Sequence, residues 1–296
     1  MSFQNMGLSR TEVISAMLSI DNTEENNYKS EGPHVKNVSG PKRVYGGYVV
    51  AQAYKAVKEY ARKIKDENPI FSMHYNFLSS GDVDKFINVK VNKMGNIYAV
   101  DLIQDGKTIG LAHVKTDHKL MESPSYPSDV PPLLSIPDLS TYISLIPAEK
   151  ERNHLQLIKD RLIYELRPVN MTSNAPGEHR IDYYARLAPE SIAHLKEDSG
   201  LGAVVGLSDF FVMQSATNVH KESGYRIALA SSMHHRIQFH QEHVEASQWF
   251  LVESRTEIAN LNKSKIHGAI FDSNKNCIVS FVQEAYMVSE KLDSKI

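Results

Sequence analysis

Residues 44–64 read VYGGYVVAQAYKAVKEYARKI, and this segment determines the expected organisation of the first half of the chain. Gly46 and Gly47 lie at its start, and residues 48–54 have no charged side chain. Apolar or aromatic side chains then recur every three or four residues, which is the spacing of an α-helix. Because the charged residues gather in the later turns, we expect a helix that begins in the interior and ends at the surface. The glycine pair could hold a phosphate, although close packing at a helix entrance is its commoner use.

The segment after this helix has the pattern of a β-meander. Residues 71–77 alternate apolar and polar side chains, the period of a half-buried strand. Further strands are expected at residues 86–91, 97–103 and 108–116, with a hairpin turn at Asp105-Gly106. A buried helix followed by an antiparallel meander predicts a compact α+β unit.

The second half of the chain repeats this order of elements. Residues 203–216, AVVGLSDFFVMQSA, form a second helical stretch that is uncharged except for Asp209. Two strands are expected before it, at residues 162–166 and 179–187. Four strands are expected after it, at residues 233–240, 249–258, 265–271 and 278–287. Ser-Met-His opens the first strand after each helix, at residues 72–74 and 232–234, so we interpret the two halves as an internal duplication.

A proline-rich segment separates the two halves. Residues 122–137 contain five prolines, a density that excludes a helix or a central strand. We therefore predict an N-terminal domain at residues 1–121, a linker at 122–137 and a C-terminal domain at 138–296, in line with the usual size of domains.

The bulk composition excludes several classes of protein. The net charge of −2 does not suggest a nucleic-acid partner. Cys277 is the only cysteine, so no disulfide can form within the chain. No apolar run reaches the roughly 18 residues that a membrane span requires, and no secretory signal pattern opens the sequence. We expect an intracellular soluble protein.

Three stretches together resemble the acyl-CoA thioesterase II family, the double hot-dog thioesterases. They are RVYGGYVVAQA at residues 43–53, HYNFLSSGD at residues 74–82, and a set in the second half that comprises residues 207–209, 232–240 and 282–284. The resemblance implies a tandem double hot-dog α+β fold, in which each half is an antiparallel sheet wrapped around a long central helix. It also implies an acyl-CoA thioesterase that hydrolyses fatty acyl-CoA to free fatty acid and CoA without a metal or another cofactor.

The resemblance further implies three catalytic residues, since the family uses an Asp on the second helix with a Ser or Thr and a Gln from second-domain strands. These positions fall on Asp209, Ser232 and Gln283. A buried carboxylate with a raised pKa can accept a proton from water, while the hydroxyl and the amide orient that water. Each residue also has a structural explanation: Asp209 could be a buried carboxylate satisfied by a cap or by a partner arginine, Ser232 could be a strand-edge serine, and Gln283 could face solvent.

The sequence also departs from the family pattern. The departures are at Tyr48, Ser79, Ser80, His234, Arg236 and Gln238. They leave open an alternative, a non-catalytic double hot-dog protein that binds acyl-CoA or serves in assembly. A hot-dog hydratase is less well supported because the chain lacks the paired Asp and His motif of that chemistry.

The histidines at positions 234, 235, 240 and 243 invite a metal interpretation. On a strand, however, His234 and His240 would share one face and His235 would take the other. A zinc site needs convergent ligands, so we expect no metal.

The final residues, Ser294-Lys295-Ile296, are similar to the Ser-Lys-Leu peroxisomal address. Together with the family resemblance, this tail predicts a peroxisomal protein that an import receptor recognises, and otherwise a cytoplasmic one. The resemblance and the exposed sheet edges also suggest a homo-oligomer.

Overall fold

The computed structural model describes residues 10–30, 32, 34, 43–117, 132–147, 149–159, 163–171, 179–192, 195 and 199–292. Its helices are α1 (Arg10–Leu18), α2 (Gly46–Lys63), the 3₁₀ helix η2 (Leu133–Ser135), α3 (Leu139–Leu145), α4 (Glu149–Lys159), α5 (Pro189–Ile192), α6 (Ser199–Leu207) and α7 (Val212–Glu222). Its strands are β1 (Asp21–Asn22), β2 (Asn27–Ser30), β3 (Ile70–Phe77), β4 (Ile87–Met94), β5 (Ile97–Gln104), β6 (Lys107–Thr116), β7 (Tyr164–Asn170), β8 (Arg180–Leu187), β9 (Tyr225–Phe239), β10 (Phe250–Asn260), β11 (Lys263–Phe271) and β12 (Cys277–Lys291).

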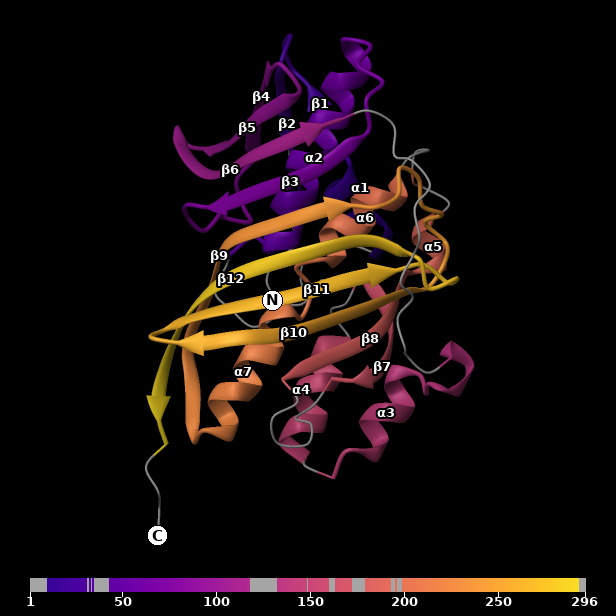
Figure 1. The fold of residues 1–296 in the computed structure, drawn as a ribbon, viewed down its shortest axis with the longest axis vertical. Helices are drawn as coiled ribbons and strands as arrows, with labels where there is room; N and C mark the ends of the chain where they lie inside the picture. Colours follow the sequence, from indigo (N-terminus) through magenta and orange to yellow (C-terminus); the bar gives the residue numbers. More distant parts are fainter. Residues whose placement is uncertain are drawn as a thin grey trace.

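All the strands belong to one antiparallel sheet, which Figure 1 shows as a curved layer with β3 and β9 side by side near its middle. Outward from this pair the neighbours are β6, β5, β4 and β2 on one side and β12, β11, β10 and β8 on the other. The matching order agrees with the predicted duplication. Because β3 pairs with β9 from Ser72↔Gln238 to Asn76↔His234, the two halves form one continuous sheet.

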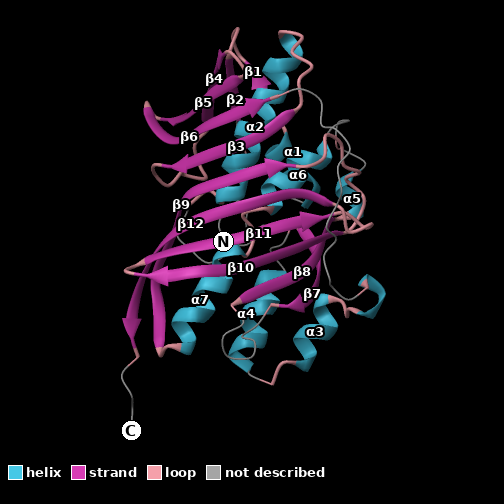
Figure 2. Ribbon diagram, viewed as in Figure 1, coloured by secondary structure: helices cyan, strands magenta, loops and turns pink. Residues whose placement is uncertain are grey.

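The helices α2, α6 and α7 lie on one face of the sheet (Figure 2). Helix α2 is buried from Gly47 through Val57 and becomes exposed towards Lys63, so the prediction of a helix that starts inside the protein is confirmed. It packs against α6 and against strands β4, β5 and β6. The first half is thus an antiparallel sheet around a buried helix.

The second helical stretch differs from the prediction. Residues 203–216 were expected to form one helix, but α6 ends at Leu207 and α7 begins at Val212. Phe211 adopts a φ of 56°, which a helix cannot contain. Aromatic packing stabilises this turn: Phe210 and Phe211 contact each other, and Tyr183 Oη donates a hydrogen bond of 2.7 Å to the Phe210 carbonyl. The prediction of an uninterrupted helix is therefore wrong, and Asp209 lies in the break.

Strand β9 is longer than predicted, because it begins at Tyr225 rather than near residue 233. Its first residues are half-buried or exposed and pair with the end of β12. Tyr225, Ile227 and Leu229 alternate with smaller or charged residues, so the sequence carried a strand signal that the prediction missed.

Two predictions fall largely or wholly outside the described residues. Of the linker, only residues 132–137 are described, and they include η2. The tail at 294–296 is not described at all, so the predicted domain boundaries and peroxisomal location stay predictions. Among the described helices, none is long and apolar enough to cross a membrane.

Candidate active site

The first turn of α2 packs closely against the last turn of α6. A Cβ at Gly47 would collide with the carbonyl oxygen of Gly206 and with the Tyr45 ring, so this position requires glycine. Tyr45 Oη donates a hydrogen bond of 2.8 Å to the same Gly206 carbonyl. The glycine pair therefore serves close packing, which brings the N-terminus of α2 to the residues that follow α6.

Asp209 lies in this contact. Its carboxylate accepts a hydrogen bond from the Gly47 backbone N–H, and a Cβ at Gly46 would come within 2.5 Å of Oδ2. The N-terminus of a helix favours a negative charge because its first N–H groups have no partner within the helix. Here that charge is the protein's own carboxylate.

The structure brings Ser232 and Gln283 to Asp209. Ser232 Oγ lies 3.5 Å from Asp209 Oδ1, and Gln283 Nε2 donates a hydrogen bond of 2.7 Å to Ser232 Oγ. The Gln283 amide also donates to the Asp209 carboxylate. The three side chains, from the α6–α7 turn, β9 and β12, thus form one connected polar group.

A β-bulge orients Ser232 towards this group. Along the β9–β12 ladder, Glu284 pairs with His234 but Ala285 pairs with Ser232, so Met233 is an extra residue on β9. Without it, Ser232 and His235 would point to opposite faces of the sheet, because side chains alternate. No pattern in the sequence indicated this bulge.

Of the structural explanations, the arginine partner of Asp209 and the solvent-facing position of Gln283 do not hold, whereas the hydrogen bond from the Gly47 N–H agrees with Asp209 as a cap of α2. In the described part of the chain, no lysine or arginine forms an ion pair with Asp209; its charge is offset only by hydrogen bonds from Gln283, Gly47 and Ser232. Gln283 is fully buried and does not face solvent.

Burial raises the pKa of Asp209 from 3.8 to about 7, and the hydrogen bonds from Gln283, the Gly47 N–H and Ser232 oppose this increase. A carboxyl group with a pKa near 7 is a stronger base than an exposed carboxylate and is still ionised at mildly alkaline pH. The arrangement can therefore accept a proton from a water molecule.

Two of the departures from the family pattern lie away from this group. Tyr48 is buried, and its hydroxyl lies 3.0 Å from both Ser30 Oγ and His34 Nδ1, so it links Ser30 of β2 and His34 to α2. His234 Nδ1 lies 2.7 Å from Asn76 Oδ1 on the exposed face of the sheet.

The other departures are also peripheral. Arg236 and Gln238 are exposed on the same face as His234, and Ser79 Oγ accepts a hydrogen bond of 3.0 Å from Lys107 Nζ. Ser80 is exposed.

The histidines do not converge. His234 and His240 are exposed, whereas His235 is buried on the other face of the sheet. Among the residues whose placement is described, no group of three or more histidine, cysteine, aspartate or glutamate side chains could hold a metal ion.

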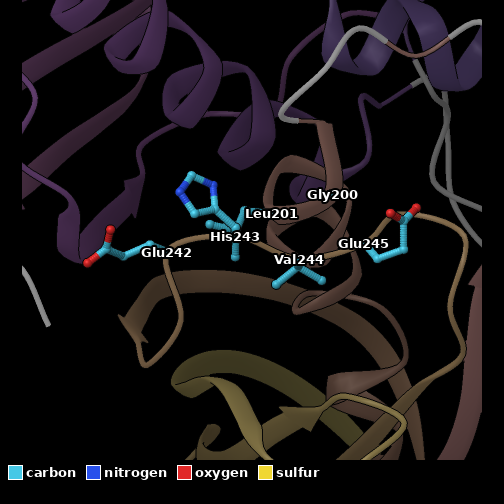
Figure 3. Close-up of a pocket in the computed structure, with 6 residues that line it drawn as sticks. All are labelled: Gly200, Leu201, Glu242, His243, Val244 and Glu245. Carbon is cyan, nitrogen blue, oxygen red and sulfur yellow. The ribbon is translucent and has the colours of Figure 1, made fainter. Parts of the chain in front are cut away.

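Two hollows in the described structure are lined by other residues. One, of about 290 Å³, lies where Gly200 and Leu201 of α6 meet the loop at residues 242–245 (Figure 3). The other, of about 650 Å³, lies on the outer face of the sheet and is lined partly by His74, His234 and Arg236. Neither hollow is lined by Asp209, Ser232 or Gln283.

Comparison with known proteins gives consistent results. The acyl-CoA thioesterase C-terminal domain family matches residues 137–287, and the acyl-CoA thioesterase N-terminal domain family matches residues 36–119. No curated protein matches the chain in sequence.

Solved structures with the same fold cover nearly the whole chain. A tesB protein of Mycobacterium avium subspecies paratuberculosis has a TM-score of 0.68 at 17% identity, covering 95% of this chain and 100% of that one. The acyl-CoA thioesterase II TesB2 of Mycobacterium marinum has a TM-score of 0.66 at 18% identity, covering 94% and 99%. A hot-dog protein of unknown function from Alicyclobacillus acidocaldarius has a TM-score of 0.70 at 14% identity, covering 94% and 98%.

These similarities confirm the tandem double hot-dog fold that the sequence predicts. The family matches span most of the chain, including both helices that meet at Asp209 and the strands that contain Ser232 and Gln283. The chain belongs to the acyl-CoA thioesterase II family and is a thioester hydrolase.

Proposed function

We propose that this thioesterase hydrolyses fatty acyl-CoA with a water molecule that Asp209 activates and that Ser232 and Gln283 orient. The observation that supports this most strongly is the connected group of these three side chains around a carboxyl group whose pKa is about 7. The coarser activity, hydrolysis of an acyl-CoA thioester, follows from the family.

In the proposed reaction the Asp209 carboxylate accepts a proton from water as the water oxygen attacks the thioester carbonyl carbon. The tetrahedral intermediate then collapses, the carbon–sulfur bond breaks, and the proton on Asp209 is available to the departing CoA thiolate. The products are a free fatty acid and CoA. Ser232 and Gln283 reduce the entropy cost of the attack because they hold the water beside the base.

Apolar side chains next to this group support an acyl substrate. Met213 Sδ lies 4.0 Å from Ser232 Oγ, and Phe77 is within 3.2 Å of the position that a Cβ on Gly46 would occupy. Both side chains are half-buried. The transfer of an apolar acyl chain from water to such surroundings lowers the free energy.

The test is the release of CoA thiol by the purified full-length protein across a series of acyl chain lengths. We expect Asp209→Asn to lower kcat by about 10²–10⁴-fold, the usual contribution of a general base. Asp101→Asn, a half-buried aspartate of β5, is the matched control and should hydrolyse at the wild-type rate. An Asp209→Asn protein that keeps full activity contradicts the mechanism, and a wild-type protein that binds acyl-CoA without releasing thiol supports the binding-protein alternative.

The homo-oligomer expected from the family resemblance belongs to the same proposal. Light scattering of the purified protein should give a mass that is a multiple of the 33.3 kDa chain. A mass of one chain at all concentrations contradicts it.

A further inference from the structure

His235 is a buried titratable side chain to which the proposed mechanism gives no role. Only 1% of its surface is exposed, and its ring contacts Phe281 with centroids 5.6 Å apart. Burial lowers the pKa of His235 to about 4, so the ring is neutral at physiological pH. A neutral imidazole has one donor nitrogen and one acceptor nitrogen, and both require partners when buried.

The two ring nitrogens of His235 face two different parts of the active site. Nε2 lies 2.8 Å from the hydroxyl of Ser208, the residue immediately before Asp209. On the other side, His235 is the cross-strand partner of Gln283 in the β9–β12 ladder, and the nearby Gln283 side chain partly opposes the lowering of the His235 pKa. His235 therefore connects the turn that contains Asp209 to the strand that contains Gln283.

The remaining buried polar atoms of this pair complement each other. Among the described residues, His235 Nδ1 and Gln283 Oε1 are both buried and neither has a hydrogen-bond partner. If Nδ1 bears the proton, it donates to Gln283 Oε1, and Nε2 accepts from the Ser208 hydroxyl, whose proton then turns away from the Val205 carbonyl, 2.8 Å from Ser208 Oγ. This tautomer satisfies both orphaned atoms and leaves Gln283 Nε2 to donate to Ser232 Oγ, as observed.

The orientation of the Gln283 amide matters because its two ends have nearly the same shape and opposite hydrogen-bonding character. If the amide rotated by half a turn, Oε1 would face Ser232 and the Asp209 carboxylate, where one acceptor would oppose another. If Nδ1 of His235 carries the proton, it can donate only to Oε1 of the Gln283 amide. The rotated amide, which would turn its NH₂ group towards Nδ1, is therefore excluded.

We propose that His235 is a positioning residue for thioester hydrolysis, which fixes the Gln283 amide so that its N–H groups face Ser232 and Asp209. This inference rests on the proposed function, since it acts through Gln283.

Two conservative variants separate the two ends of the ring. His235→Asn retains a polar atom near the position of Nδ1 and can still contact Gln283, whereas His235→Gln places its amide near Nε2 and contacts Ser208 instead. We expect His235→Gln to lower kcat by about tenfold, the effect of one lost hydrogen bond, while KM changes little. His235→Asn should retain more of the activity. His234→Asn, the preceding residue on the opposite face of the sheet, is the matched control and should match the wild type.

The deciding experiment is a double-mutant cycle with Gln283→Ala, measured as kcat for CoA release by the full-length protein, with circular dichroism to confirm folding. If His235 acts through Gln283, His235→Gln causes no further loss in the Gln283→Ala background. If the kcat losses of the two single variants multiply in the double variant, or if the His235→Gln protein is folded and fully active, the inference is overturned but the proposed function remains intact. A fully active Gln283→Ala protein overturns both this inference and the assigned role of Gln283.

Discussion

At the residue scale, the main feature is one carboxyl group in surroundings that oppose its ionisation. Asp209 could be identified from the sequence because it interrupts an otherwise uncharged segment and matches a family position. Its partner Gly47 could not, since the contact joins distant parts of the chain and depends on how α2 meets α6. The role suggested for His235 was also missed, because strand alternation shows which face a side chain takes but not the partners it meets there.

The raised pKa of Asp209 predicts an effect on stability. The folded protein holds a proton on Asp209 up to about pH 7, whereas the unfolded chain releases it near pH 3.8. The free energy of unfolding therefore falls as the pH rises through this window. Because asparagine does not ionise, Asp209→Asn should raise the Tm by a few degrees at pH 8.

Thermal unfolding followed by circular dichroism measures this effect. The difference in Tm between Asp209→Asn and the wild type should shrink as the pH is lowered towards 4. An Asp209→Asn protein that is less stable than the wild type at pH 8 would contradict the assigned burial cost.

At the element scale, the features that build the site are the break between α6 and α7, the bulge on β9 and the contact of α2 with α6. Strands such as β3 and β5 were predictable because their side chains alternate or form apolar runs. The helix break was not, since residues 203–216 contain neither glycine nor proline at the break and Phe211 adopts its left-handed backbone only with tertiary support. The bulge at Met233 likewise depends on the register with β12.

The contact between the helices predicts different effects for the two glycines of α2. In a helix, replacing glycine by alanine is intrinsically favourable by up to about 1 kcal/mol. At Gly47, however, the new Cβ would collide with the Gly206 carbonyl, and overpacking of this kind costs about 1–3 kcal/mol. Gly47→Ala should therefore lower both Tm and activity. Gly46→Ala should chiefly lower kcat, because its Cβ meets the Asp209 carboxylate.

Thermal unfolding and CoA release together distinguish these outcomes. A Gly47→Ala protein that is more stable than the wild type would show that α2 and α6 do not pack as closely as described.

At the scale of the whole molecule, the candidate active site draws on both halves of the chain. The second half contains Asp209, Ser232 and Gln283, but the first provides the Gly47 N–H and strand β3, which pairs with β9. The duplication was predictable from the repeated order of helix and strands. The continuity of the sheet through β3 and β9 was not, because edge pairing between two similar units leaves no periodic pattern in either.

This dependence predicts the behaviour of a divided protein. Residues 138–296 expressed alone should hydrolyse acyl-CoA poorly, because Asp209 loses a hydrogen-bond donor and β9 loses its neighbour. Co-expression with residues 1–121 should restore thiol release. Wild-type activity of residues 138–296 alone would contradict the role of the first half.

The central claim, that Asp209 is the base with a pKa near 7, is tested most directly by the pH dependence of kcat/KM for CoA release. This profile reports the pKa of the essential base in the free enzyme. We predict that kcat/KM rises with pH and levels off with a midpoint at about 7, and that Asp209→Asn removes this rise. A profile that is flat between about pH 5 and 9, or a midpoint near the ordinary value of 3.8, would contradict the account.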